Sequence, residues 1–182
     1  MQTQLNTAIF KSYDVRGIYP AQLNEDVAYQ IGRCFVPLLG AKTVAVGRDM
    51  RPSGKSLFEA FARGASEAGA DVIDVGLVST DALYFAVGKF GYDGGVMITA
   101  SHNPAEYNGM KFTRGQAQAI SLETGLAEIR DRILSGTLPP KAVKPGSIAH
   151  ANILDDFAEH CLSFIDRSKI KPFKIAVDAG NG

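Results

Sequence analysis

The sequence of 182 residues contains no tryptophan, three histidines and two cysteines, Cys34 and Cys161. Neither cysteine has another Cys or a His at the spacing of a metal site, so we expect two structural thiols buried on apolar helix faces. The sequence also lacks a run of about 18 apolar residues, and residues 1–10 lack the basic and apolar segments of a secretory signal. The expected compartment is the cytoplasm, and no membrane partner is predicted.

A net charge is missing as well, because 19 basic residues balance 19 acidic ones. The whole chain therefore has no electrostatic field that would attract nucleic acid or an anionic membrane, and any anion has to be bound locally. Hydrophobic residues make up 46% and charged residues 21%, as in soluble globular proteins. The length suits one α/β domain and part of a second.

Short apolar segments rich in β-branched residues predict strands at 43–46, 71–75 and 95–99. Such nearly continuous apolar runs suit strands that are covered by helices on both faces of a sheet.

Helical periodicity predicts a helix after the N-cap Asn24, followed by helices at about 53–68, 81–90 and 121–134. The residues expected to face the core are Val27, Ile31, Phe35 and Leu38 in the first helix, Leu57, Phe61 and Ala65 in the second, and Leu122, Leu126, Ile129 and Ile133 in the fourth.

Residues 137–147 contain three prolines and one glycine and predict a connector between domains, with a boundary near Gly146. The predicted fold is a three-layer α/β/α sandwich with a mixed, mostly parallel sheet in residues 1–146. Residues 147–182 are the truncated start of a second, similar domain, with a helix at 153–165 and a strand at 173–177. Because that last strand would leave an unpaired edge, we expect a fragment of a longer protein, although a short complete protein is the alternative.

The segment Thr99-Ala100-Ser101-His102-Asn103-Pro104 begins where a predicted strand ends, and Tyr107-Asn108-Gly109-Met110-Lys111-Phe112 follows it. In open α/β sheets, ligands collect beyond the carboxyl ends of the strands, so Ser101 stands where chemistry is expected. Lys111 could reach back toward the serine as a cation or a proton-transfer group. The alternative is an Asx-type turn with a solvated lysine. A Ser-His-Asp hydrolase is disfavoured because the Gly-x-Ser-x-Gly pattern is missing.

This loop resembles the active-site serine loop of the α-D-phosphohexomutase superfamily. Three further blocks resemble the family's motifs in order and spacing: Phe10-Lys11-Ser12-Tyr13-Asp14-Val15-Arg16-Gly17-Ile18, Val46-Gly47-Arg48-Asp49-Met50-Arg51-Pro52-Ser53-Gly54 and Val177-Asp178-Ala179-Gly180-Asn181-Gly182. Tyr107 is more similar to the phosphomannomutase/phosphoglucomutase branch than to phosphoglucosamine mutase, whose loop usually has an acidic residue at this place. A phosphoglucosamine mutase fragment is the alternative within the superfamily.

The resemblance implies that Ser101 carries a phosphoryl group and passes it to a hexose phosphate, so that hexose 6-phosphate and hexose 1-phosphate interconvert through a bisphosphorylated sugar. Phosphoryl transfer depends on position and on concentrated positive charge. Arg16 would hold phosphate oxygens, Lys111 would act as general acid/base and His102 would lie beside substrate oxygens. The alternatives are an ion pair of Arg16 with Asp14, simple charge balance for Lys111 and a loop-bracing hydrogen bond for His102.

Two further residues, Tyr13 and Asn103, are expected to bind substrate, although a core position is slightly favoured for Tyr13. The cations Arg48 and Arg51 could face anions at the start of the helix near Ser53. For Arg48 we instead expect an ion pair with Asp49 that fixes the strand-to-helix turn.

The resemblance also implies magnesium, held by the phosphate on Ser101 together with aspartates that this chain does not contain. It further implies a glucose 1,6-bisphosphate-type activator and domains II to IV of a parent chain as partners. We therefore expect no mutase turnover from these 182 residues alone. The alternative from another class is a non-catalytic phosphosugar-binding or interaction module.

Overall fold

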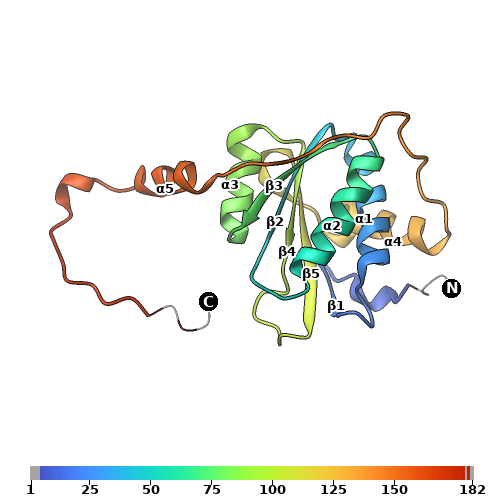
Figure 1. Cartoon of the computed structure of the whole chain (residues 1–182), viewed down its shortest axis with the longest axis horizontal. Coiled ribbons are helices and arrows are strands. Elements are labelled where there is room, and N and C mark those ends of the chain that lie inside the picture. The colour runs from blue at the N-terminus through green and yellow to red at the C-terminus, as the bar shows by residue number, and fades with distance from the viewer. Residues whose placement is uncertain (1–4, 179, 181–182) are drawn as a thin grey trace.

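A computed structural model describes residues 5–178 and 180 and shows a sheet with helices on both faces (Figure 1). The strand order is β1-β5-β4-β2-β3-β7, and β6 pairs with the end of β5 that β1 does not reach. The strands are β1 Val15–Ile18, β2 Thr43–Arg48, β3 Asp71–Leu77, β4 Gly94–Ile98, β5 Tyr107–Arg114, β6 Gln118–Ala119 and β7 Ile148–His150.

The sheet is mixed, and its centre is parallel. β2 pairs in parallel with β3 and β4, and β7 adds to β3 in parallel. β5 is antiparallel to β1, β4 and β6, so it alone runs against the other strands of the described sheet. The predicted mixed, mostly parallel sheet is therefore confirmed.

Helices cover the two faces in unequal numbers. The α-helices are α1 Glu25–Leu39, α2 Gly54–Glu67, α3 Thr80–Phe90, α4 Ala127–Leu134 and α5 Leu154–Leu162, and the short helical turns are η1 Thr7–Ile9, η2 Gly115–Ala117, η3 Leu122–Leu126 and η4 Arg167–Lys169. One hydrophobic cluster joins the sheet to α1, α2 and α4, and a second joins it to α3 (Figure 1). This arrangement is the predicted α/β/α sandwich.

The predicted N-cap and apolar faces of the helices in the first hydrophobic cluster are confirmed. Asn24 caps α1, because its side-chain oxygen accepts a hydrogen bond of 3.1 Å from the Val27 N–H. Phe35 of α1 is fully buried between Phe61 of α2 and Phe112 of β5, with ring centroids 5.9 and 5.6 Å apart. The apolar stripes of α1 and α2 therefore form the centre of the core.

The predicted helix at 121–134 is interrupted. A wide turn, η3, spans Leu122–Leu126, Gly125 has a non-helical backbone, and α4 begins only at Ala127. The backbone at Gly125 packs closely on α1, where an added Cβ would lie 2.8 Å from Leu38 Cδ2. Tertiary packing therefore overrides the regular helical period here.

Two predictions in the C-terminal part are wrong. Cys34 is buried, and burial raises the pKa of its thiol to about 11, but Cys161 is exposed on α5. Residues 173–177 form no strand; their side chains are exposed and they pair with no strand of the described chain. Both differences have one cause: a strand and an apolar helix face need a partner, and the described residues provide none at these positions.

The connector at 137–147 runs along the sandwich. The N–H of Gly146 donates to the Ser66 carbonyl (2.9 Å), and the Ser66 hydroxyl donates to the Gly146 carbonyl (2.6 Å). Beyond it β7 adds to the edge of the sheet, with Ile148 beside Val72. A domain boundary near Gly146 stays a prediction. No helix in the described part of the chain is long and apolar enough to cross a membrane.

Candidate active site

The serine loop connects β4 to β5 at the carboxyl end of the parallel strands. Ser101 is exposed and has a φ of 55°, in the left-handed region that non-glycine residues rarely adopt. Its N–H donates to the Thr99 hydroxyl at 2.8 Å. Such backbone positions persist where surrounding contacts enforce them and are frequent at functional sites. The structure thus places Ser101 at a strand end, facing solvent, as the sequence predicts.

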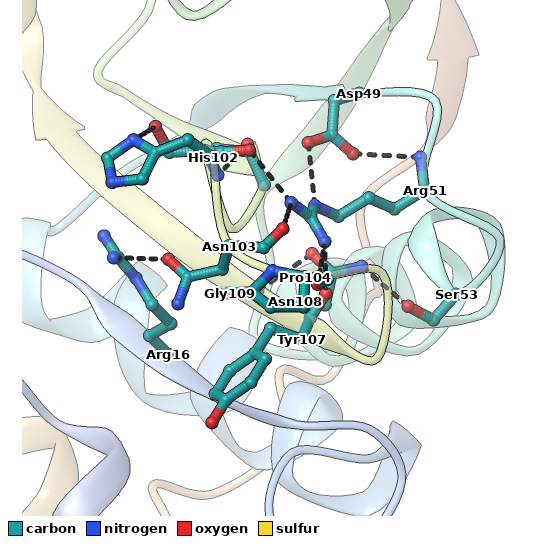
Figure 2. Close-up of polar contacts among 12 residues, drawn as sticks. Arg16, Asp49, Arg51, Ser53, His102, Asn103, Pro104, Tyr107, Asn108 and Gly109 are labelled. Atoms are coloured by element: carbon teal, nitrogen blue, oxygen red, sulfur yellow. Dashed lines mark hydrogen bonds and ion pairs between the residues drawn. The ribbon is translucent and has the colours of Figure 1, made fainter. Parts of the chain in front are cut away.

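Two cations meet beside this loop on a shared carboxylate. Asp14 is only 7% exposed, and its Oδ2 lies 2.5 Å from Arg16 Nη2 and 3.5 Å from Lys111 Nζ. The other terminal nitrogen of Arg16 donates to the Asn103 side-chain oxygen at 2.8 Å (Figure 2). Arg16 therefore makes the ion pair with Asp14 and also contacts the serine loop. Lys111 reaches this cluster through Asp14.

His102 and Tyr13 differ in their relation to the loop. His102 Nδ1 lies 3.2 Å from the hydroxyl oxygen of the adjacent Ser101, and both residues are exposed. Tyr13 is 71% exposed, so the core position considered for it is wrong. Beside the cluster lies a hollow of about 520 Å³, lined by Ala8, Lys11, Asp14, Arg16, Gln22, Asn103 and Tyr107. The sequence did not single out Lys11 or Gln22, because their closeness to the loop depends on the pairing of β1 with β5.

The ion pair expected between Arg48 and Asp49 is wrong. Arg48 Nη1 donates to Asp74 Oδ1 on the neighbouring strand at 2.7 Å, and its guanidinium carbon lies 4.8 Å from the centre of the Phe58 ring. Asp49 instead accepts from the Arg51 N–H at 3.1 Å and lies 3.4 Å from Arg51 Nε. The reason is local geometry, because consecutive side chains at a strand end point to opposite faces.

The Arg51 guanidinium is turned into the serine loop (Figure 2). Nη1 donates to the carbonyls of Pro104 and Tyr107, both at 2.8 Å, and Nη2 donates to the carbonyls of Ser101 and Asn103 at 2.9 and 2.6 Å. The sequence gives no signal for this contact, because arginine and loop are separated by about fifty residues.

The start of β5 is fixed by a buried asparagine and a glycine. Asn108 is fully buried, donates to the Ser53 hydroxyl at 2.8 Å and accepts from the Gly109 N–H at 2.8 Å. A Cβ at Gly109 would lie 2.4 Å from the Val15 carbonyl oxygen and 2.9 Å from that of Thr99. Only glycine allows the three backbones to come so close.

The described residues do not form a metal centre by themselves. Nowhere in residues 5–178 do three or more His, Cys, Asp or Glu side chains lie close enough together to hold a metal ion. Asp14, which lies beside the loop, is already engaged with two cations.

Comparison with known proteins decides the family. The family model described as phosphoglucomutase/phosphomannomutase, alpha/beta/alpha domain I, matches residues 7–139. The chain belongs to this family. Its match covers the sandwich except β7, and every residue of the serine loop and the Asp14 cluster. The motif at 177–182 follows the matched region, and residues 179, 181 and 182 lie outside the described residues.

Relatives agree with the family assignment. A phosphomannomutase of Salmonella montevideo is 40% identical over 178 residues, which is 97% of this chain and 39% of the relative. Phosphohexose mutases of Xanthomonas campestris pv. campestris (strain B100) are 44% identical over 174 residues, 95% of this chain and 38% of the relative. This chain thus spans about two fifths of the length of these family members.

Solved structures agree with the fold. The crystal structure of a phosphoglucomutase/phosphomannomutase family protein from Burkholderia thailandensis has a TM-score of 0.78 at 35% identity, covering 87% of this chain and 36% of that one. A structure from Thermus thermophilus, at 24% identity and a TM-score of 0.76, covers 92% of this chain and 38% of that one and shares the fold.

Proposed function

We propose that Ser101 is the phosphoryl carrier of a phosphomannomutase/phosphoglucomutase and that this chain is its amino-terminal, serine-bearing part. The reaction would interconvert hexose 6-phosphate and hexose 1-phosphate through a phosphoserine and a bisphosphorylated sugar. The observation that carries the proposal is the exposed Ser101, held in a left-handed conformation at the end of β4 in the loop that Arg16 contacts. Relatives named phosphomannomutase and phosphohexose mutases support it.

In the transfer step the bond between the Ser101 oxygen and phosphorus breaks while a sugar hydroxyl forms a bond to the same phosphorus. Positive charge close to the loop stabilises the phosphoryl oxygens, and Arg16 supplies it from a fixed position. Lys111 is assigned the transfer of the proton from the attacking sugar hydroxyl to the Ser101 oxygen, which leaves as a hydroxyl. The two cations share Asp14, so the carboxylate sets the distance between them.

Substrate contacts are assigned to two residues that line the hollow, Arg16 and Asn103, and to two that do not line it, Tyr13 and His102. Asn103 and Tyr13 are proposed to bind the sugar phosphate together with Arg16, and His102 is proposed to lie beside substrate oxygens. Asn103 is well placed for this, because its side chain already receives a hydrogen bond from Arg16 and lines the hollow.

Magnesium is part of the proposal only in combination with residues outside this chain. The phosphate on Ser101 would supply one ligand oxygen, and the described residues provide no carboxylate cluster for the rest. When bound, the ion would neutralise charge on the phosphoryl oxygens. We propose that turnover also requires domains II to IV of the parent chain and a glucose 1,6-bisphosphate-type activator. The proposed location is the cytoplasm.

The test uses the complete reading frame that encodes this chain. Intact mass is expected to show one added phosphate, lost in Ser101→Ala and kept in the control Ser135→Ala, which removes an exposed hydroxyl at the C-terminal end of α4. Turnover of glucose 1-phosphate or mannose 1-phosphate with glucose 1,6-bisphosphate should disappear in the first variant only. The 182 residues alone should show none. Undiminished turnover by Ser101→Ala would refute the proposal.

A further inference from the structure

One arginine binds four carbonyl groups of the serine loop. The two terminal nitrogens of Arg51 donate to the carbonyls of Ser101, Asn103, Pro104 and Tyr107 at 2.6–2.9 Å. A planar guanidinium has five N–H donors in a rigid fork, and hydrogen bonds from a charged donor are stronger than neutral ones. The loop therefore wraps around a single cationic centre.

Arg51 is itself held firmly. Its side chain is only 9% exposed, Asp49 Oδ2 lies 3.4 Å from its Nε, and Asp49 Oδ1 accepts from its backbone N–H at 3.1 Å. Asp49 directly follows β2, and its own N–H donates to the Ile98 carbonyl at the end of β4 at 3.1 Å. The guanidinium is thus anchored to β2 and β4, and the loop emerges from the end of β4.

The orientation of the carbonyls fixes the opposite side of the loop as well. In a planar trans peptide the C=O and the following N–H point in opposite directions. Because the carbonyls of Ser101 and Pro104 face Arg51, the N–H groups of His102 and Ala105 face away from it. Figure 2 shows the Arg51 guanidinium on one side of the loop and the His102 ring on the other. The negative ends of the peptide dipoles are gathered on the arginine side, which leaves the other side favourable to an anion.

From this geometry we infer that Arg51 is a positioning residue for phosphoryl transfer. It sets the conformation of residues 99–107 that presents Ser101, and it turns the loop carbonyls away from the negatively charged phosphoryl group. Arg51 acts through the loop backbone and does not touch the substrate. This inference rests on the proposed function of Ser101.

The experiment compares Arg51→Gln and Arg51→Lys with a matched control, Arg48→Gln, in the complete reading frame. Arg48 lies three residues earlier and pairs with Asp74, and the structure gives it no bond to the serine loop. Hydrogen exchange should become at least about tenfold faster at the hydrogen-bonded loop amides of Ser101, Asn103 and Tyr107 in Arg51→Gln and stay unchanged in the control. The lysine variant should lie between, because one ammonium reaches fewer carbonyls.

Steady-state kinetics give the second readout. A misplacement of about 1 Å can cost roughly 100-fold in rate, so kcat of Arg51→Gln should fall by about that factor while KM changes less than about threefold. Arg51→Lys should recover part of the loss and keeps the test usable if the glutamine variant does not fold.

Unchanged loop exchange, or an unchanged kcat in the two Arg51 variants, would overturn the inference. If the proposed role of Ser101 as phosphoryl carrier is wrong, the Ser101→Ala variant will show full turnover. In that case the catalytic part of the inference falls, and the exchange rates still decide whether Arg51 controls the loop.

Discussion

Replacing Gly109 by alanine should disturb the site through the backbone alone. The new Cβ would lie 2.4 Å from the Val15 carbonyl oxygen on β1 and 2.9 Å from the Thr99 carbonyl oxygen at the end of β4. Carbon–oxygen contacts between strands are normally about 3.3–3.6 Å, so β1 and β5 would have to separate by about 1 Å. Neither obstacle is a flexible side chain that could move aside.

The expected cost follows from this enforced separation. Overpacking in a well-packed interior typically costs about 1–3 kcal/mol, and a clash with two backbones belongs at the upper part of that range. For a chain of this size each kcal/mol lowers the melting temperature by roughly 2–4 °C, so a loss of about 2–3 kcal/mol corresponds to roughly 4–12 °C. Because Arg16 lies opposite Gly109 on β1, the change also moves this cation relative to the serine loop.

The matched control is Gly88→Ala. Gly88 lies exposed in α3 with no atom within 4 Å of an added Cβ, so alanine should stabilise the helix by about 0.5–1 kcal/mol. Thermal unfolding followed by circular dichroism should therefore show shifts of opposite sign for the same chemical change. Equal shifts, or a Gly109→Ala variant as stable as the parent, would refute the reasoning.

Three further predictions concern thiols, acid and the shared carboxylate. At pH 8 a thiol reagent should modify Cys161 rapidly and Cys34 only after unfolding, because burial raises the pKa of Cys34 to about 11; rapid loss of both thiols in the native protein would contradict this. Hydrogen bonds from the N–H and hydroxyl of Ser147 hold the pKa of Asp71 below its usual value of 3.8. A lowered carboxyl pKa stabilises the fold fully above the usual value, and that effect is lost as the pH falls through the lowered one. The protection of the β7 amides relative to intrinsic exchange should therefore fall in acid, and less so in Asp71→Asn. Asp14→Asn should lower the free energy of unfolding, measured in urea, by about 1–3 kcal/mol, because it leaves two cations without their carboxylate. This value lies between those of surface and buried ion pairs. An unchanged urea midpoint would show that the ion pairs of Asp14 do not stabilise the fold.

The parts of the fold that the sequence predicts correctly depend on local signals. The N-cap Asn24 and the apolar stripe of α1 act within one helix, and the Gly-terminated apolar runs mark the parallel strands, so Ser101 could be placed at a strand end. β1 and β5 were not predicted as strands. Their pairing depends on the close approach at Gly109, and a sequence pattern carries no information on which backbone comes near.

The errors at the site arise from long-range choices. Arg48, Asp49 and Arg51 are three charged residues within four positions, and any of them could pair locally. Arg48 pairs with Asp74 on the next strand, and Arg51 binds a loop about fifty residues further along. Those partners are decided by the order of strands in the sheet, which periodicity cannot provide.

The antiparallel direction of β5 has a mechanical consequence for the position of Ser101. A connection between a strand and a helix has only one end on the sheet. The serine loop instead leaves β4 and returns directly into β5 beside it. Where the two strands meet the loop, the Thr99 N–H donates to the Gly109 carbonyl. Both stems are fixed in the same rigid sheet. If Ser101 is the phosphoryl carrier proposed above, its hydroxyl stays in place and the sugar has to move, presenting first one oxygen and then another to a point that does not follow it.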